Sequence, residues 1–518
     1  MKLARTKNAF RNTAWGVLYR FVALVGPFAI KTIIIKRIGM EYSGLNTLFN
    51  SILTVLDLAN LGFSSSLVYT MYDAVARDDH NAICAMLNFF CKVYRIIGLV
   101  ILGMGLCVMP FLPQLVGSGA PADANLYVMW SLYLLNAVMQ YVIFGYVHAI
   151  FSAYQREDAR LKIMVVRYIV QYALQIVILL VTANYYLYLI TLPLMVIPND
   201  LANYYAAKKQ FPLISCTGMP SPETKKAIYH RVKTLFAHKV GYTIVVNVDS
   251  ILISSALGLS VQSLYSNYYY ILNAVAALVE IITTGCLAGI GNKLITDTED
   301  DNHRTFLNLT YGWVALIGLC STCMLCLYQP FIGGIWIGRE GLLDTSVVVL
   351  LALMFYFWMF RVMQSTYRDA AGLWTKDWPK SLIGMVVKLV LSIPLIRMTQ
   401  HIGGALLPTI LIQLLLYFPW EVYLLYRHIF HRSSKGYVLQ MFKYTLLTLT
   451  GGALSYGCCQ WLFPTNSPLT FLARLCIVCI IFPAVWVAAT FRTAEFRGML
   501  QLGQRILSKF LPRGKADS

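Results

Sequence analysis

Eight ionisable side chains lie deep inside otherwise apolar stretches of this chain. Five of them are cations and three are acids: Arg20, Lys31, Lys239, Arg361 and Lys388, and Asp57, Asp249 and Glu280. Charged groups at membrane depth are costly, so they normally face a wet cavity or an opposite charge. Two further arginines, Arg167 and Arg474, lie only a few residues from the end of an apolar stretch. We expect these two to extend to the membrane surface instead.

The excess of cations over acids in this set favours an anionic ligand. We therefore expect the five cations to bind an anionic headgroup. The three acids are candidates for coupling to protons or sodium, with neutralisation of a neighbouring cation as the alternative. Asp57 and Glu280 lie near the middle of their apolar stretches, too deep to reach the surface easily.

Motifs for catalysis or metal binding are lacking in the sequence. Cys320, Cys323 and Cys326 have a spacing that could ligate a metal, but their surroundings read as a membrane helix without a fourth ligand. Small, polarisable residues packed between helices explain them better. No Asp-x-Asp, P-loop or His-Glu-x-x-His motif occurs. The sequence therefore predicts a protein that is not an enzyme and that has no metal and no cofactor.

The composition indicates that lipid is the main solvent of the elements that hold these residues. Of the 518 residues, 58% are apolar and only 13% are charged, and the mean hydropathy is +0.63. An ordinary soluble domain has about 25% charged residues. The formal net charge is +19, but no stretch is long enough to form a basic nucleic-acid-binding module. Soluble globular, disordered and nucleic-acid-binding proteins are thereby excluded.

The sequence predicts an all-α polytopic membrane protein with about fourteen transmembrane helices, each of about 20 apolar residues. The predicted spans are 14–36, 44–72, 88–116, 125–154, 163–183, 185–207, 232–256, 262–292, 306–329, 346–371, 380–397, 402–426, 442–463 and 470–491.

Charge in the loops gives the expected orientation. If the N-terminus is cytoplasmic and the spans alternate, the inside segments hold 28 Lys and Arg residues and the outside loops hold only Arg37 and Arg339. Lys and Arg collect in short cytoplasmic loops. We therefore expect both termini to be cytoplasmic.

A weak internal repeat organises the spans. A shift of 219 residues places Ile38-Gly39 on Leu257-Gly258 and Arg20 on Lys239. Because the loop charges keep the same sign, the repeat is parallel. The predicted domains are an N-terminal six-helix bundle (1–210), a cytoplasmic linker (211–231), a C-terminal six-helix bundle (232–430), two additional transmembrane helices (431–491) and a basic amphipathic tail on the membrane surface (492–518).

The first 72 residues carry a recognisable pattern. It includes Asn12-x-x-Trp15-Gly16, Pro27-Phe28, Ile38-Gly39-x-Glu41-Tyr42-x-Gly44-Leu45-Asn46 and Leu58-Ala59-x-Leu61-Gly62. This pattern resembles the polysaccharide repeat-unit flippases of the multidrug/oligosaccharidyl-lipid/polysaccharide exporter superfamily. In that pattern an acid often precedes the Leu-Gly, whereas this chain has Asn60 there and its nearest acid, Asp57, one turn earlier.

The resemblance implies two six-helix bundles around a central cavity. It also implies a substrate, an oligosaccharide on undecaprenyl pyrophosphate, which is moved between leaflets of the bacterial inner membrane for capsule, exopolysaccharide or O-antigen assembly. Membrane lipids, a polysaccharide polymerase and glycosyltransferases are the expected partners. The alternatives are a cation-coupled multidrug exporter of the same superfamily, a flippase for peptidoglycan precursors and, from a different class, a membrane polysaccharide polymerase or ligase.

Overall fold

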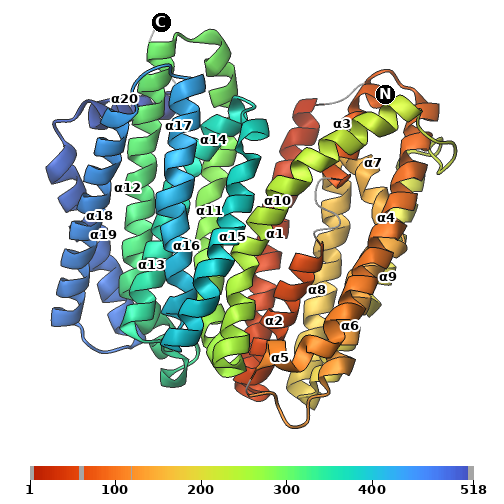
Figure 1. The fold of residues 1–518 in the computed structure, drawn as a ribbon, viewed down its shortest axis with the longest axis horizontal. Helices are drawn as coiled ribbons and strands as arrows, with labels where there is room; N and C mark the ends of the chain where they lie inside the picture. Colours follow the sequence, from red (N-terminus) through yellow and green to blue (C-terminus); the bar gives the residue numbers. More distant parts are fainter. Residues whose placement is uncertain (1–4, 58–62, 118, 511–518) are drawn as a thin grey trace, which may run out of the picture. The chain divides into compact units, whose positions relative to one another are not determined.

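The computed structural model describes residues 5–57, 63–117 and 119–510, and the regular elements among them are all helices (Figure 1). The last part of the sequence motif, Leu58-Ala59-Asn60-Leu61-Gly62, lies outside the described residues. The confirmed fold class is therefore all-α. Contacts divide the chain into two compact units.

Unit 1 comprises residues 1–266, 381–389 and 396–401. Its helices are α1 (Arg5–Arg37), α2 (Met40–Leu56), α3 (Phe63–Ala76), α4 (His80–Val108), α5 (Leu112–Val116), α6 (Leu126–Val142), α7 (His148–Ala153), α8 (Glu157–Thr182), α9 (Tyr185–Gln210), α10 (Pro222–Leu257), the start of α11 (Leu259–Thr296) and parts of α15 (Trp374–Thr399).

Unit 2 comprises residues 267–380, 390–395 and 402–518. It holds the rest of α11 and α15 together with α12 (Glu299–Phe331), α13 (Thr345–Phe360), α14 (Val362–Ala370), α16 (Gly403–Ile412), α17 (Phe418–His428), α18 (Lys435–Leu462), α19 (Pro468–Thr490) and α20 (Ala494–Phe510). A π-helical turn, Gln413–Tyr417, connects α16 to α17. The domain boundaries expected from the sequence differ from these contact units and stay a prediction.

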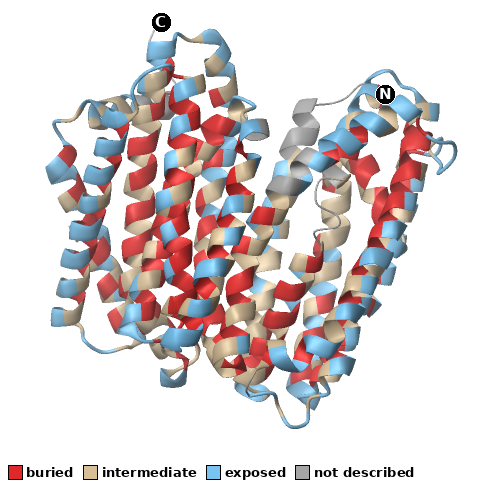
Figure 2. Ribbon diagram, viewed as in Figure 1, coloured by how far each residue is buried: buried red, intermediate tan, exposed pale blue. Residues whose placement is uncertain are grey.

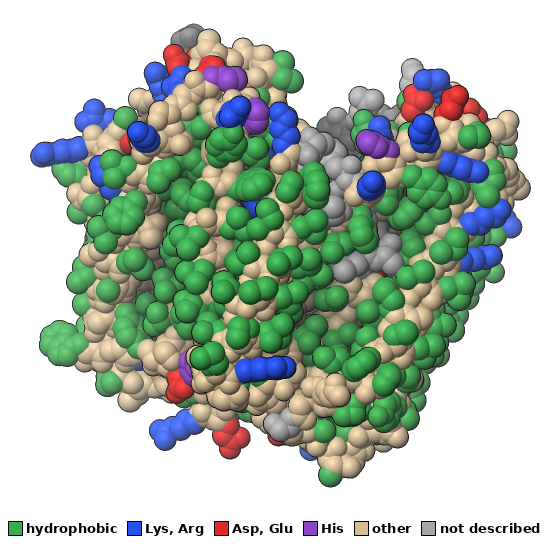
Figure 3. Space-filling view, in the orientation of Figure 1, with side chains coloured by type: hydrophobic (Ala, Val, Ile, Leu, Met, Phe, Trp, Pro, Cys, Tyr) green, Lys and Arg blue, Asp and Glu red, His purple; other side chains and the backbone are tan. Residues whose placement is uncertain are grey.

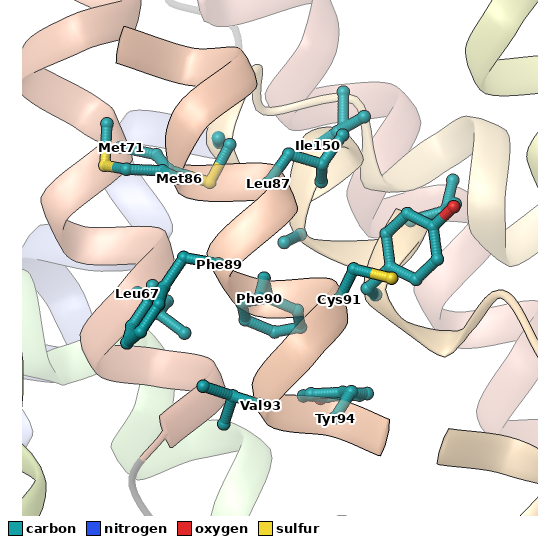
Figure 4. Close-up of a cluster of buried hydrophobic side chains, with 14 of the residues drawn as sticks. Leu67, Met71, Met86, Leu87, Phe89, Phe90, Cys91, Val93, Tyr94 and Ile150 are labelled. Atoms are coloured by element: carbon teal, nitrogen blue, oxygen red, sulfur yellow. The ribbon is translucent and has the colours of Figure 1, made fainter. Parts of the chain in front are cut away.

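Side-chain packing follows the lipid-facing pattern of a membrane protein. Buried residues concentrate where helices face each other, above all along α12, α13 and the α16–α17 segment (Figure 2). On the visible face, hydrophobic side chains cover the middle of the helices and charged ones gather near the helix ends (Figure 3). One core cluster of unit 1 packs Leu67 and Met71 of α3 against Phe89 and Phe90 of α4 and Ile150 of α7 (Figure 4).

The number of membrane-crossing helices is supported only in part. Each of the fourteen predicted ranges coincides with one helix or with consecutive helices. Among the described residues, ten helices are long and apolar enough to cross a membrane. The count becomes eleven if α6 and the segment Gly145–Ala153, which meet at a bend of 51°, form one broken span. The segments α2–α3, α9 and α18 do not meet that standard, so fourteen remains a prediction.

The loops of unit 1 sort to the two ends of its helices as the charge analysis predicts. At one end Asn12 accepts a hydrogen bond from the Asp158 amide (2.7 Å), and Asn88 donates to the Gly218 carbonyl (2.7 Å). All of these residues lie in or beside segments predicted to be inside. At the other end the Asn125 amide donates to the Tyr186 hydroxyl (2.7 Å). Both of those residues border loops predicted to be outside.

Unit 2 shows the same sorting. Gly334, in the long loop predicted to be outside, approaches Asn466 and Ser467 of the next outside loop so closely that a Cβ would lie 2.9 Å from the Ser467 Cα atom. Lys293, Arg432 and Arg497, from three different segments predicted to be inside, line one cavity. Loops expected on the same side of the membrane therefore lie together. Which side is cytoplasmic is still a prediction.

The two junctions related by the 219-residue shift have related backbones. The α1–α2 junction turns at Gly39 (φ +139°) and the α10–α11 junction at Gly258 (φ +90°). Both conformations are strained for residues with a Cβ atom, so glycine is required at each. The aligned dipeptides Ile38-Gly39 and Leu257-Gly258 thus mark equivalent turns between a first and a second helix.

Candidate functional site

A buried ion pair joins α10 and α15 within unit 1. The Lys388 ammonium donates to Asp249 Oδ2 at 2.8 Å and to the Val245 carbonyl at 3.0 Å. Both side chains are almost fully buried. The structure therefore brings together one predicted cation and one predicted acid that are 139 residues apart in the sequence. A buried charge is normally paired in this way because an isolated one would be prohibitively costly.

A glycine contact permits the close approach of these two helices. Gly241 of α10 faces the Ser381 carbonyl of α15, and a Cβ on residue 241 would lie only 2.3 Å from that oxygen. Small residues allow membrane helices to approach closely enough for polar contacts across the interface. The position of Lys388 beside Asp249 thus depends on Gly241, two turns earlier on α10.

Lys31 of α1 reaches the first turns of α11. Its ammonium donates to Ser266 Oγ at 2.7 Å, and Ser266 Oγ in turn donates to the Ser263 carbonyl. Lys31 is half-buried and lies one turn after Pro27, which removes a backbone donor from α1. Next to it, Gly44 of α2 packs on the Leu259 carbonyl, with a Cβ position 2.3 Å from the oxygen. The α1–α2 and α10–α11 junctions therefore pack on each other.

The remaining predicted residues of unit 1 are more open. Arg20 is exposed on α1, and Lys239 is half-exposed on α10. Within the described part of the chain, neither of these cations has a hydrogen-bond or ion-pair partner. The acid Asp57 caps the C-terminal end of α2 and accepts a hydrogen bond from the Tyr141 hydroxyl of α6. The two cations related by the repeat are thus available to a ligand.

Arg361 lies in a second buried network, within unit 2. Its Nε donates to Gln413 Oε1 (2.6 Å), and its Nη1 donates to Glu421 Oε1 (2.7 Å). Arg361 occupies the break between α13 and α14, and Gln413 begins the π-helical turn. Both backbone irregularities therefore lie at this network, as is common at functional positions in helices.

Three further residues of this network were not predicted. Lys380 and Arg368 both donate to Glu421 and both form ion pairs with Asp377. Arg368 and Lys380 lie near the ends of the predicted spans 346–371 and 380–397, and Asp377 falls between these spans, whereas α15 already begins at Trp374. A signal was available: Asp377 and Lys380 have the three-residue spacing of neighbours on one helix face.

Glu280 of α11 also belongs to unit 2 and is half-buried. Its backbone carbonyl accepts hydrogen bonds from the hydroxyls of Thr283 (3.0 Å) and Thr284 (2.9 Å). Its proposed role in ion coupling stays a prediction.

One expectation about charged residues is wrong. Arg474 of α19 does not extend to the membrane surface, since its exposed fraction is 1%. Its guanidinium donates to the backbone carbonyls of Cys326 (3.2 Å) and Phe463 (2.7 Å). The five donors of the guanidinium let it satisfy several carbonyls at once, so burial near the helix end replaces extension to the surface.

The charged side chains of this site can bind and release a charged ligand without making or breaking a covalent bond. Among the described residues, no group of three or more His, Cys, Asp or Glu side chains could hold a metal ion. In unit 1, the predicted cations Arg20 and Lys239 are accessible, whereas the predicted acid Asp249 is paired with Lys388 and Asp57 is hydrogen-bonded to Tyr141. Such a set suits reversible binding of an anion by charge-assisted hydrogen bonds.

Comparison with known proteins gives a clear answer on the fold. No protein-family model and no curated protein sequence matches the chain. Among solved structures, the lipid II flippase MurJ in an inward closed conformation is 13% identical, with a TM-score of 0.63. The match covers 92% of this chain and 98% of that one. An inward-facing multidrug resistance transporter of the MATE family is also 13% identical, with a TM-score of 0.56. It covers 78% of this chain and 93% of its own.

A third match is a mutant form of the Vibrio cholerae MATE transporter VcmN, at 13% identity and a TM-score of 0.54. It covers 82% of this chain and 98% of its own. The matched structures are transporters and extend over most of the helices described above. This chain therefore has the same fold as the lipid II flippase and the MATE transporters that it matches.

Proposed function

We propose that this chain is a transporter, and not an enzyme, that moves undecaprenyl-pyrophosphate-linked oligosaccharides from the inner to the outer leaflet of a bacterial inner membrane. The substrate would serve capsule, exopolysaccharide or O-antigen assembly, and transport would proceed by alternating access. The glycosyltransferases that build the oligosaccharide and a polymerase that consumes it are the proposed partners. Both termini would face the cytoplasm.

The observation that supports an anionic substrate is the unbalanced positive charge of unit 1. Asp249 is neutralised by Lys388, and Asp57 accepts a hydrogen bond from the Tyr141 hydroxyl. Arg20 and Lys239 have no acidic partner among the described residues. A pyrophosphate group would supply the missing negative charge. An exporter of cationic drugs would need an acidic cavity, whereas the predicted set holds five cations and three acids, so the multidrug alternative is not favoured.

The test is leaflet exchange in liposomes that contain the purified protein and a fluorescent lipid-linked oligosaccharide. We expect Arg20→Ala and Lys239→Ala each to slow exchange about tenfold or more, because a hydrogen bond to a charged group contributes about 1.5–3 kcal/mol. Arg20→Lys should slow exchange less than Arg20→Ala, since lysine keeps the charge but not the bidentate fork.

The matched control is Arg95→Ala. Arg95 is also an exposed arginine within a long apolar helix of unit 1, but it lies on α4 rather than on the helices related by the repeat. Its removal should leave exchange unchanged. If the triple variant Arg20→Ala, Lys31→Ala, Lys239→Ala folds and exchanges at the wild-type rate, these cations do not bind the substrate.

A further inference from the structure

Within unit 2, helices α13 and α18 leave a groove between them. Both helices pack along α12, which forms the floor of the groove. The volume of this α13–α18 groove is about 290 Å³, and its lining residues come from 321–325 of α12, 349–356 of α13 and 448–456 of α18. The groove therefore lies among three helices of a single unit.

Small residues create the free space. The Ser321 hydroxyl of α12 donates to the Ala352 carbonyl of α13 at 2.8 Å, which holds these two helices together. Gly452 of α18 lies against α12, and a Cβ on this residue would be 3.4 Å from Thr322 Oγ1. Small residues let membrane helices approach each other closely. Because Ala352, Gly452 and its neighbour Ala453 all line the groove, the volume that larger side chains would fill stays open.

The groove lies at the depth of lipid hydrocarbon. All of its lining residues fall within the predicted spans 306–329, 346–371 and 442–463. Val349 and Leu449 line it from opposite sides, and their exposed fractions are 36% and 46%. The opening between α13 and α18 is therefore apolar and faces the surroundings of the helices rather than a loop.

The lining offers nothing that water could bind. Among the described residues that line the groove, none carries a charge. The hydroxyls of Ser321, Thr322 and Thr448 all donate to backbone carbonyls at 2.8–2.9 Å. The hydroxyls of the two lining tyrosines are hydrogen-bonded as well. A buried water needs two to four polar partners, and apolar cavities stay dry, so only an apolar ligand suits this groove.

One end of the groove is closed. The Tyr356 hydroxyl of α13 forms a hydrogen bond of 3.1 Å with Thr445 Oγ1 of α18. Both residues lie toward the helix ends that are predicted to be cytoplasmic, whereas Val349 and Tyr456 lie toward the opposite ends. A chain in the groove would therefore enter from the leaflet predicted to be outer and end near Tyr356.

We propose that the α13–α18 groove binds one acyl chain of a membrane phospholipid. An empty groove would forfeit the dispersion contacts of its lining atoms, and a hydrocarbon chain restores them. Phospholipid acyl chains are the main hydrocarbon at this depth. The volume lies just below the range of about 300–1,000 Å³ that holds drug-sized ligands, so it suits part of a single chain. The bound chain would join α13 to α18, and this site does not depend on the proposed transport function.

The experiment counts lipids on the purified full-length protein. The protein is placed in nanodiscs that contain palmitoyl-oleoyl phosphatidylglycerol and undecaprenyl phosphate, and native mass spectrometry records which lipids stay bound after release. Gly452→Leu should weaken phosphatidylglycerol retention at least about tenfold, because the leucine side chain occupies the groove and the loss of about ten dispersion contacts is sufficient for this factor. Ala453→Leu is a second groove variant, on an exposed position that tolerates a larger side chain.

The matched control is Gly457→Leu, also on α18, where no atom lies within 4 Å of the added Cβ and which does not line the groove. It gains the same helix propensity and should retain phosphatidylglycerol like the wild type. In lipid-free detergent, added phosphatidylglycerol should raise the melting temperature of the wild type and of this control, but not that of Gly452→Leu.

Equal phosphatidylglycerol retention by the wild type and both groove variants would overturn the proposal. So would a change in the retention of undecaprenyl phosphate alone, which would assign the groove to an isoprenoid chain. Leaflet exchange is not measured, so failure here leaves the proposed function untouched.

Discussion

At the scale of single residues, the buried charges differ in which partners neutralise them. Lys388 and Asp249 satisfy each other inside unit 1. Arg361 is one of three cations that share Glu421 in unit 2. A buried ion pair is weak evidence for stability, because replacing both partners with apolar residues often costs nothing, whereas removing one leaves an uncompensated charge. Substitutions at both positions of a pair can therefore separate structural and transport roles.

We expect Asp249→Asn to lower the free energy of unfolding by about 3–5 kcal/mol, because the Lys388 ammonium would remain buried without its carboxylate. The double variant Asp249→Leu, Lys388→Met should recover most of this loss. Unfolding in detergent measures both effects.

Leaflet exchange by the double variant then decides the role of the pair. Restored stability with lost exchange would support Lys388 in substrate binding and Asp249 in ion coupling, as the sequence analysis predicts. Restored stability with normal exchange would show that the pair is structural and that both site predictions are wrong.

At the scale of helices, close contacts at glycine decide which polar groups can meet. Gly241 brings α10 against the Ser381 carbonyl of α15, and Gly44 brings α2 against the start of α11. The hydrophobic effect does not drive helix association within lipid, so packing and interhelical hydrogen bonds must do so. A methyl group at either glycine would separate the helices and lengthen the polar contacts beside them.

Gly241→Ala should therefore lower stability by about 1–3 kcal/mol, the usual cost of overpacking a well-packed interior. The matched substitution is Gly457→Ala in α18, where no atom lies within 4 Å of the added Cβ. That change should be neutral or should stabilise by up to about 1 kcal/mol through helix propensity. Melting temperatures of the two variants in the same detergent test the contrast, and equal melting would refute the role given to Gly241.

At the scale of the whole molecule, the loops of each unit collect at two ends, and the charge count predicts which end is cytoplasmic. The 28 Lys and Arg residues predicted to be inside, against two outside, assign the side. Cys216, exposed in the segment between α9 and α10, is a natural reporter for the predicted inside.

A membrane-impermeant maleimide should label Cys216 only after cells are opened, and Cys216→Ser should abolish that label. Partial desolvation by neighbouring groups raises the pKa of the Cys216 thiol. Because the thiolate is the reactive form, labelling should be slow at neutral pH and should accelerate as the pH rises. Labelling of intact cells, or a cytoplasmic reporter that is active when fused after residue 340, would invert the predicted topology.

The sequence predicts the helices well because hydropathy is a local property of consecutive residues. It also locates the junctions at Gly39 and Gly258, because the glycines required there are visible in the repeat. It does not predict which charges meet. Asp249 and Lys388 are paired only by the packing of α10 on α15. Asp377 falls between two predicted spans because a carboxylate buried against an opposite charge has the same local hydropathy as an exposed one.

The burial of Arg474 has a consequence for how the protein is made. Helix α19 is synthesised well after α12, and inserting an arginine into a bilayer costs about 2.5–3.5 kcal/mol when it must find its own solvation. The carbonyls that solvate it belong to Cys326, in a helix made about 150 residues earlier, and to Phe463. Arg474 is therefore fully solvated only once α19 has packed beside α12, so helix packing must follow the insertion of both helices.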